Sequence, residues 1–315
     1  MSRATRPFPV VAIAPMVTSM TTTTRRLRPT TDSAVPDRGP RTITLTAGTW
    51  GGVVDRLDRV ITDAARAYLQ GLRHRDIPID PLAWARELDR LTQGRPLDYG
   101  RPGLPLMYAV RYMPRRVISL MGALSIATSG RPLVSLVDVG SGTGATIVAI
   151  QLLYASLEPP LTGVDASQEM VEFARRTQDA RRHQAAFVEG TIESLINDPA
   201  PIASSDLVTF SAPFDRTFNQ WAPLAAALDT TETQSVLAVE PESRAFLLYQ
   251  FEAAFRRHGW QTRRSGSRDI PAFMKAERPL PGLTRFWRQI GAPGAYQPQT
   301  WWEPPADEYL IASRS

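Results

Sequence analysis

Three glycines and an aspartate between residues 138 and 144 are the part of the sequence best suited to hold a ligand. Asp138–Gly144 (Asp-Val-Gly-Ser-Gly-Thr-Gly) follows an apolar run and precedes an apolar stretch with helical spacing. Glycine permits a sharp turn and close approach of the backbone to a ligand. Free N–H groups at the start of the next helix would point toward that ligand. The segment therefore predicts a nucleotide-cofactor loop between a strand and a helix.

Features around this loop distinguish between cofactors. The loop followed by Ala145 also fits the dinucleotide pattern, so the glycines by themselves leave a nicotinamide cofactor open. Asp138 disfavours that alternative, because dinucleotide folds carry an apolar residue there. Asp165, within Gly163–Met170, ends the second expected strand, and its carboxylate can accept both ribose hydroxyls of an adenosine. Phe187–Thr191 ends the third expected strand at the height of an adenine.

Together these motifs resemble those of class I S-adenosylmethionine-dependent methyltransferases, in the family's order, over about residues 133–260. The resemblance implies that S-adenosylmethionine is the cofactor and that the glycine loop holds its methionine part. It also implies that Asp165 binds the ribose and that Ala166 and Met170 border the adenine.

Two later segments extend the resemblance. Gly190 and Thr191 stand where many members carry Gly-Asp, which implies an adenine contact through backbone here. Ser211 follows the fourth expected strand, where the family contacts cofactor and substrate. The cofactor-binding residues implied are Asp138, Val139, Gly140, Ser141, Gly142, Gly144, Asp165, Ala166, Met170, Gly190, Thr191 and Ser211.

Several of these residues also have a purely structural interpretation. Asp165 is consistent with a cap for the next helix, and Thr191 with an ordinary polar residue at a strand end. Ser211 lacks the G-x-S-x-G surroundings of a hydrolase nucleophile. The three histidines lie beside arginines on stretches that we expect to be exposed, without metal-ligand spacing. No metal site is predicted.

Methyl transfer places few demands on catalytic side chains. The sulfonium already makes the methyl group electrophilic, so the protein mainly aligns the reactants and excludes water. A general base is needed only for a nucleophile that is protonated near neutrality. Asp215, Glu240 and Tyr108 are the candidates for such a base, although each has a structural role as its alternative.

Short apolar runs alternate with amphipathic stretches from residue 133 onward, which predicts an α/β fold. The expectation is a doubly wound, Rossmann-like, mostly parallel sheet with helices on both faces. The expected strands are Leu133–Val139, Leu161–Val164, Ala185–Val188, Leu207–Phe210, Val236–Val239 and Glu308–Ala312. The expected helices are Thr143–Tyr154, Gln168–Arg182, Asp215–Leu228 and Arg244–His258.

A helical cap is expected before the sheet. Apolar residues recur with helical spacing from residue 53, with Gly71 as a stop. Pro81 opens a second helix, and a third covers Leu106–Ala127 with a break at Pro114. The predicted organisation is a tail over 1–48, a helical cap region over 49–130 and a methyltransferase domain over 131–315.

The net charge of +5 lies entirely in residues 1–31, so the rest of the chain has equal numbers of acidic and basic residues. It therefore lacks the excess of positive charge that is typical of nucleic-acid-binding proteins. The absence of cysteine excludes disulfides and Cys-held metal clusters. No apolar run is long enough to span a membrane. A cytoplasmic protein is expected, with residues 1–31 as a disordered tail, an upstream start or an organellar transit peptide.

A small-molecule acceptor is the leading hypothesis, because a helical cap can close a pocket. RNA or a ribosomal protein is the alternative, since basic residues and tryptophans are interleaved near residues 255–278. Tyr108–Pro114 and Val239–Ser243 are similar to segments of methyltransferase-like proteins linked to the small ribosomal subunit, a group with cluster-binding cysteines that this chain lacks. A non-catalytic assembly protein is the third hypothesis.

Overall fold

The structure is a computed structural model that describes most of the chain after residue 40. The described residues are 41–42, 45–92, 97–128, 133–156, 160–178, 185–214, 218–276, 278–292 and 307–314. The description below concerns the unit Arg38–Ser315. Most of the predicted tail, Asp215 and His183 lie outside the described residues.

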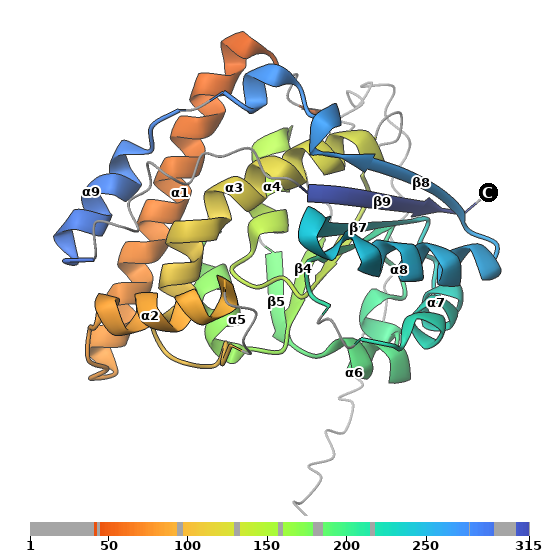
Figure 1. The fold of residues 1–315 in the computed structure, drawn as a ribbon, viewed down its shortest axis with the longest axis horizontal. Coiled ribbons are helices and arrows are strands. Elements are labelled where there is room, and N and C mark those ends of the chain that lie inside the picture. Colours follow the sequence, from red (N-terminus) through yellow and green to blue (C-terminus); the bar gives the residue numbers. More distant parts are fainter. Residues whose placement is uncertain are drawn as a thin grey trace, which may run out of the picture. The chain divides into compact units, whose positions relative to one another are not determined.

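A seven-stranded sheet with the order β5-β4-β2-β6-β7-β9-β8 is at the centre of the fold (Figure 1). All pairs from β5 to β7 are parallel, and β9 is antiparallel to both of its neighbours. The predicted mostly parallel, doubly wound sheet is confirmed. Its strands are β2 (Leu136–Val139), β4 (Leu161–Asp165), β5 (Ala185–Glu189), β6 (Leu207–Ser211), β7 (Ser235–Pro241), β8 (Gln261–Gly266) and β9 (Asp307–Ser313).

The strand register brings the carboxyl ends of the parallel strands to one edge. Val139 at the end of β2 pairs with Val164 of β4 and with Phe210 of β6. The strand order reverses at β2, which lies between β4 and β6. Ligands of open α/β sheets bind outside the carboxyl ends at such a reversal. Asp138 therefore stands at the position that the fold favours for a ligand.

Alternation along the strands divides the core into two layers. Leu237 of β7 and Tyr309 of β9 pack with the cap helices, whereas Ala238 and Leu310 pack with helices of the opposite face. The helices after β2 are α4 (Ala145–Leu153), α5 (Gln168–Arg176), α6 (Ile192–Asn197), α7 (Trp221–Asp229), α8 (Ala245–Arg257) and α9 (Pro281–Gln289). Helices α4 and α5 contribute to the first cluster, and α7 and α8 to the second. Both faces of the sheet are thus covered, as a parallel sheet requires.

The cap consists of α1 (Ala47–His74), α2 (Pro81–Thr92) and α3 (Leu104–Ala127). The stop predicted at Gly71 is wrong, because α1 continues for another turn. A Cβ at Gly71 would lie 2.8 Å from Arg176 Nη2, so the glycine serves a close contact with α5. The break predicted at Pro114 is also wrong. Most of α3 is buried, and that packing offsets the hydrogen bond that proline removes.

Several elements were not predicted from the sequence. Strand β8 reads Gln-Thr-Arg-Arg-Ser-Gly and lacks an apolar alternation, but it pairs along its length with β9 as an edge strand. Helices α6 and α9 are short, and β1 (Arg41–Thr42) forms a two-stranded sheet with β3 (Tyr154–Ser156). Helix α7 begins at Trp221 rather than at residue 215, and α5 ends at Arg176 rather than at residue 182.

The carboxylate of Asp58 fixes α9 against α1. It is buried and accepts the backbone N–H groups of Gly282 at 2.7 Å and of Leu283 at 2.8 Å. These donors lie in the first turn of α9, where the helix itself offers them no partner. Asp58 therefore acts as a helix cap supplied by another helix.

We expect Asp58→Ala to lower the free energy of unfolding by about 2 kcal/mol, because two buried N–H donors lose their acceptor. The exposed Asp55 of the same helix provides the control, and Asp55→Ala should change stability by less than about 0.5 kcal/mol. Urea unfolding of both variants measures the difference. Equal losses in the two variants would contradict this role for Asp58.

Candidate functional site

The loop after β2 has three glycines with left-handed backbone, each for a different reason. Gly140 (φ 71°) lies against Pro213, whose Cβ would be 2.3 Å from an added Cβ. Gly144 (φ 85°) is enclosed by side chains that include Phe187. A Cβ at Gly142 (φ 52°) would meet no atom within 4 Å. The middle of the loop therefore borders open space, while its two ends are packed against protein.

Asp165 connects the end of β4 to this loop. Its Oδ2 accepts the Gly142 N–H at 2.7 Å, and its Oδ1 accepts the Ser167 N–H at 2.9 Å. Burial raises the pKa of Asp165, and the two N–H donors oppose that effect. The side chain that caps α5 belongs to Ser167, which accepts from the Met170 N–H. Asp165 therefore holds the loop and the start of α5 together.

Asp138 lies fully buried beneath the loop. Thr209 donates to its Oδ1 at 2.7 Å, whereas its Oδ2 has no hydrogen-bond partner. Burial raises the pKa of Asp138 to about 7. The hydroxyls of Ser141 and Thr143 are also buried without a partner. Buried polar atoms are rarely left unpaired, so this group is suited to a polar ligand at the loop.

The other predicted cofactor residues lie at the same edge of the sheet in differing surroundings. Met170 is buried, and Ala166 is exposed. Gly190 donates its N–H to the carbonyl of Asp165 at 2.9 Å. The Thr191 hydroxyl accepts from the Ser194 N–H at 3.0 Å and so caps α6. The side chain of Thr191 is thus engaged in helix capping, which was its alternative interpretation.

A strained loop follows β6. Ala212 has a φ of 55°, a conformation that few residues other than glycine adopt. Its N–H donates to the Val239 carbonyl at 2.8 Å. Arg244 donates to the carbonyls of Phe214 at 3.1 Å and Ala212 at 3.3 Å, and so holds the loop from the other side. Arg244 was not predicted from the sequence, because only the fold brings it to this loop.

Glu240 at the end of β7 completes this clamp. It is fully buried, and its Oε2 lies 2.8 Å from Arg244 Nη2 while its Oε1 has no hydrogen-bond partner. Burial raises the pKa of Glu240 to about 7, against the attraction of Arg244 and Arg116. Arg116 in turn pairs with Asp307 at 3.3 Å. The sequence analysis named Glu240 as a candidate base. In the structure its carboxylate pairs with Arg244, which supports the structural alternative.

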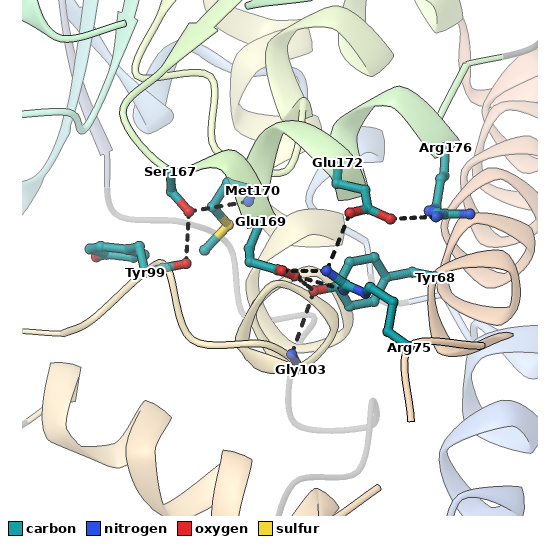
Figure 2. Close-up of polar contacts among 9 residues, drawn as sticks. All are labelled: Tyr68, Arg75, Tyr99, Gly103, Ser167, Glu169, Met170, Glu172 and Arg176. Carbon is teal, nitrogen blue, oxygen red and sulfur yellow. Dashed lines mark hydrogen bonds and ion pairs between the residues drawn. The ribbon is translucent and has the colours of Figure 1, made fainter. Parts of the chain in front are cut away.

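The cap is attached to the first turns of α5 through a polar cluster (Figure 2). Tyr68 and Arg75 both donate to the carboxylate of Glu169, Arg75 at 2.6 Å to Oε1. Glu172 pairs with Arg176 at 2.6 Å. These contacts join α1 to the helix that follows Asp165. Sequence reasoning gave Tyr68, Arg75 and Glu169 no role at the site, because Tyr68 and Glu169 lie about 100 residues apart in the chain.

A second contact attaches the segment before α3 to the same helix. The Ser167 hydroxyl donates to the Tyr99 carbonyl at 2.7 Å (Figure 2). The ring of Tyr99 contacts Tyr108, and that of Tyr108 contacts Tyr112, with centroids 6.4 Å and 5.2 Å apart. Burial raises the pKa of Tyr99, and opposing electrostatic effects come from Arg244 and Asp165. Tyr99 therefore extends this row of tyrosines to the edge of the loops described above.

The basic stretch at residues 255–278 is mostly engaged within the protein. Arg256 and Arg264 pair with Glu252, at 2.7 Å and 2.6 Å, and Arg263 donates to the Ile126 carbonyl. Trp260 and Trp287 are buried in the core, whereas Trp301 and Trp302 lie outside the described residues. The two described tryptophans therefore do not present their rings to an RNA strand.

His74 and His258 are exposed, as expected. Among the described residues, no group of side chains is arranged to hold a metal ion. Within the same part of the chain, every helix is too short or too polar to cross a bilayer.

Comparison with known proteins identifies a known domain in the segment that contains the glycine loop and Asp165. Residues 136–231 match the family described as a methyltransferase domain. No curated protein matches the chain by sequence. Similar solved structures include the plantazolicin methyltransferase BamL in complex with a triazolic desmethylPZN analog and SAH. BamL is 14% identical to this chain, the match covers 82% of this chain and 100% of BamL, and the TM-score is 0.40. TrmN from Thermus thermophilus is also 14% identical, with 66% and 53% covered and a TM-score of 0.42.

Residues 136–231 therefore carry a methyltransferase domain. The assignment rests on the matched domain and on a sheet in which a glycine loop follows β2 and an acid ends β4. The matched domain is that of an enzyme whose reaction is methyl transfer. The predicted fold class is thereby confirmed, and the matched domain agrees with the methyltransferase family that the motifs resemble. The open space at Gly142 and the unpaired buried oxygens of Asp138 and Ser141 fit a polar cofactor.

We expect the stability of the ligand-free protein to fall between pH 6 and pH 8. The pKa values of Asp138 and Glu240 are about 7 in the folded state, whereas in the unfolded chain both carboxyls are already ionised at pH 6. At pH 6 the folded state thus binds protons that the unfolded chain has released, so raising the pH lowers the free energy of unfolding, by about 1 kcal/mol per carboxyl by pH 8, where both states are ionised. Asp138→Asn and Glu240→Gln should each remove about half of this decline in stability.

Urea unfolding at pH 6, 7 and 8 measures these slopes. The exposed Glu242 is the control, and Glu242→Gln should retain the full decline of the wild type. A decline of unchanged size in both Asp138→Asn and Glu240→Gln would show that neither buried carboxyl titrates in this range.

Proposed function

We propose that the protein transfers the methyl group of S-adenosylmethionine to a small molecule bound between the cap and the carboxyl edge of the sheet. The observation that carries this proposal is a row of three tyrosines, the exposed Tyr99 and the half-buried Tyr108 and Tyr112. The row begins near the end of β4, since the Tyr99 carbonyl accepts from Ser167, two residues after Asp165. An apolar cap with polar tips is typical of a pocket for a drug-sized ligand. In this proposal the cap region at 49–130 and the domain at 131–315 act as one unit.

The cofactor would be held by residues from three strand ends. The proposed residues are those of the sequence prediction: Asp138, Val139, Gly140, Ser141, Gly142, Gly144, Asp165, Ala166, Met170, Gly190, Thr191 and Ser211. For Thr191 the contribution would come from backbone, since its hydroxyl caps α6. Bound S-adenosylmethionine supplies an electrophilic methyl group, which requires little covalent help from protein.

The chain's own residues would then position the reactants. Asp165 holds the glycine loop in place by accepting the Gly142 N–H. Arg244 and Glu240 fix the loop after β6 in its strained conformation, so that this loop needs no rearrangement when the acceptor binds. The cap would exclude water from the reacting groups.

The alternatives retain their tests. For an acceptor such as RNA, the basic stretch would have to be free, but Arg256, Arg264 and Arg263 have partners within the protein. A non-catalytic assembly protein would bind the cofactor and transfer no methyl group. Salt-sensitive RNA binding, or binding of cofactor without turnover, would favour one or the other.

Two glycines allow a matched test of the cofactor loop. Gly142 and Gly259 both have positive φ, 52° and 82°, and at both a Cβ would meet nothing within 4 Å. Alanine should therefore cost about 1 kcal/mol of stability at either position, through backbone strain. Only Gly142→Ala should weaken S-adenosylmethionine, by at least about tenfold, because its methyl group would enter the space of the cofactor.

Calorimetric titration of both variants with S-adenosylmethionine measures this difference, and thermal unfolding confirms that their stabilities match. Equal affinity in Gly142→Ala, Gly259→Ala and the wild type would contradict a cofactor at the loop.

The function itself is tested with the wild type, Asp165→Ala and a cofactor that carries a labelled methyl group. We expect micromolar binding of S-adenosylmethionine and S-adenosylhomocysteine, lost in Asp165→Ala. Label should then pass to the small-molecule fraction of a broad extract and leave the RNA and protein fractions unlabelled. Label in RNA or in a ribosomal protein would overturn the proposed acceptor class, and turnover that persists in Asp165→Ala would overturn the proposed site.

A further inference from the structure

One face of α3 combines two phenols with a guanidinium that has no ion pair among the described residues. Tyr108, Tyr112 and Arg115 stand four and three residues apart and so lie on one stripe of the helix. All three side chains are half-buried. Tyr99 continues this stripe through its ring contact with Tyr108. We name these four residues the tyrosine face.

Polar groups of the tyrosine face are left without protein partners. The hydroxyls of Tyr99, Tyr108 and Tyr112 donate no hydrogen bond to any described residue, and Arg115 forms neither an ion pair nor a hydrogen bond there. Burial raises the pKa values of Tyr99 and Tyr112, which keeps these phenols protonated as donors. Four donors thus lie along one partly buried stripe, and the described residues supply none of them with an acceptor. Such a surface favours a ligand rich in acceptors.

The charges around the tyrosine face favour an anion at the end that carries Arg115. Arg111 lies over the Tyr112 ring at 5.4 Å and pairs with Asp89 at 3.1 Å. Arg244, at the other end, is neutralised by Glu240 at 2.8 Å. Arg115 is therefore the cation that remains uncompensated among the described groups that affect Tyr112.

The rings of the tyrosine face favour a flat ligand. Adjacent rings are inclined by 74° and 54°, so they present edges and faces to a molecule lying along α3. Aromatic groups pack on such rings in offset or edge-to-face arrangements. A flat ligand along this stripe would run from the region of Asp165, past Tyr108, to Arg115.

We propose that the tyrosine face holds the acceptor as an aromatic carboxylic acid, with its ring against Tyr108 and Tyr112 and its carboxylate at Arg115. This inference rests on the proposed function, because it names the acceptor class of the same site. It makes Arg115 a specificity-determining residue that binds the end of the acceptor remote from the cofactor. A guanidinium binds a carboxylate through charge-assisted hydrogen bonds that a neutral amide cannot match.

Three isosteric probes test the proposal on the full chain: 2-naphthoate, its neutral amide 2-naphthamide and the cation 2-naphthylmethylamine. Each is titrated calorimetrically with and without saturating S-adenosylhomocysteine. We expect 2-naphthoate to bind at least about tenfold more tightly than the amide, and the amine to bind most weakly. Arg115→Gln should abolish the preference for the acid while leaving the affinity for S-adenosylhomocysteine unchanged.

Two more variants separate the parts of the tyrosine face. Tyr112→Leu should weaken the acid and the amide by the same factor, because it removes a ring contact and no charge. The exposed Arg257 on α8 is the control, and Arg257→Gln should retain the full preference. The proposal is overturned if the amide binds as tightly as the acid, if the amine binds best, if no probe binds, or if Arg115→Gln keeps the preference.

Failure of the proposed function remains distinguishable in the same titrations. Absence of S-adenosylhomocysteine binding, together with an Arg115-dependent preference for 2-naphthoate, would contradict the methyltransferase site and retain the acid-binding face. Binding of S-adenosylhomocysteine without a preference for the acid would retain the methyltransferase and remove the proposed acceptor class.

Discussion

The carboxylate of Asp165 is the contact on which the site depends. It accepts one N–H from the glycine loop and one from the start of α5, at 2.7 Å and 2.9 Å. The loop forms one hydrogen bond of its own, from the Gly144 N–H to the Ser141 carbonyl, and the Val164 carbonyl of β4 accepts the N–H groups of Gly140 and Ser141. The neighbouring strand therefore supplies most of the loop's partners. The parallel pairing of β2 and β4 brings Asp165 to the place where it meets this need.

The cap helices and one face of the sheet share a single apolar core, so the cap is held against the sheet. Trp50 of α1, Leu120 of α3 and Ile147 of α4 belong to one buried cluster that also includes Tyr309 of β9. Polar contacts then fix the position of the cap: Tyr68 and Arg75 of α1 donate to Glu169 of α5. The hydroxyl of Ser167, just before α5, donates to a backbone carbonyl in the segment before α3. Burial supplies the cohesion, and these directional bonds supply the alignment.

Buried charge is concentrated where the chemistry is proposed. Asp138 and Glu240 are fully buried carboxyls at the ends of β2 and β7, and each keeps an oxygen without a hydrogen-bond partner. Burying a carboxylate costs free energy unless a cation or donors compensate it. Arg244 compensates Glu240 in part and at the same time holds the strained Ala212. The buried carboxyls and the strained Ala212 thus lower the stability of the fold, while Arg244 holds the loop after β6 in one conformation.

The sequence by itself determined the parallel sheet, the glycine loop with Asp138 and the acid that ends β4, because local spacing and strand-end chemistry encode them. It did not reveal β8, whose arginines form a strand only through pairing with β9, nor the continuation of α1 past Gly71, which depends on Arg176. Arg244, Glu169 and the tyrosine face likewise acquire their roles from contacts between distant segments. Tertiary structure decided these features because their partners lie far away in the chain, beyond the reach of any local pattern.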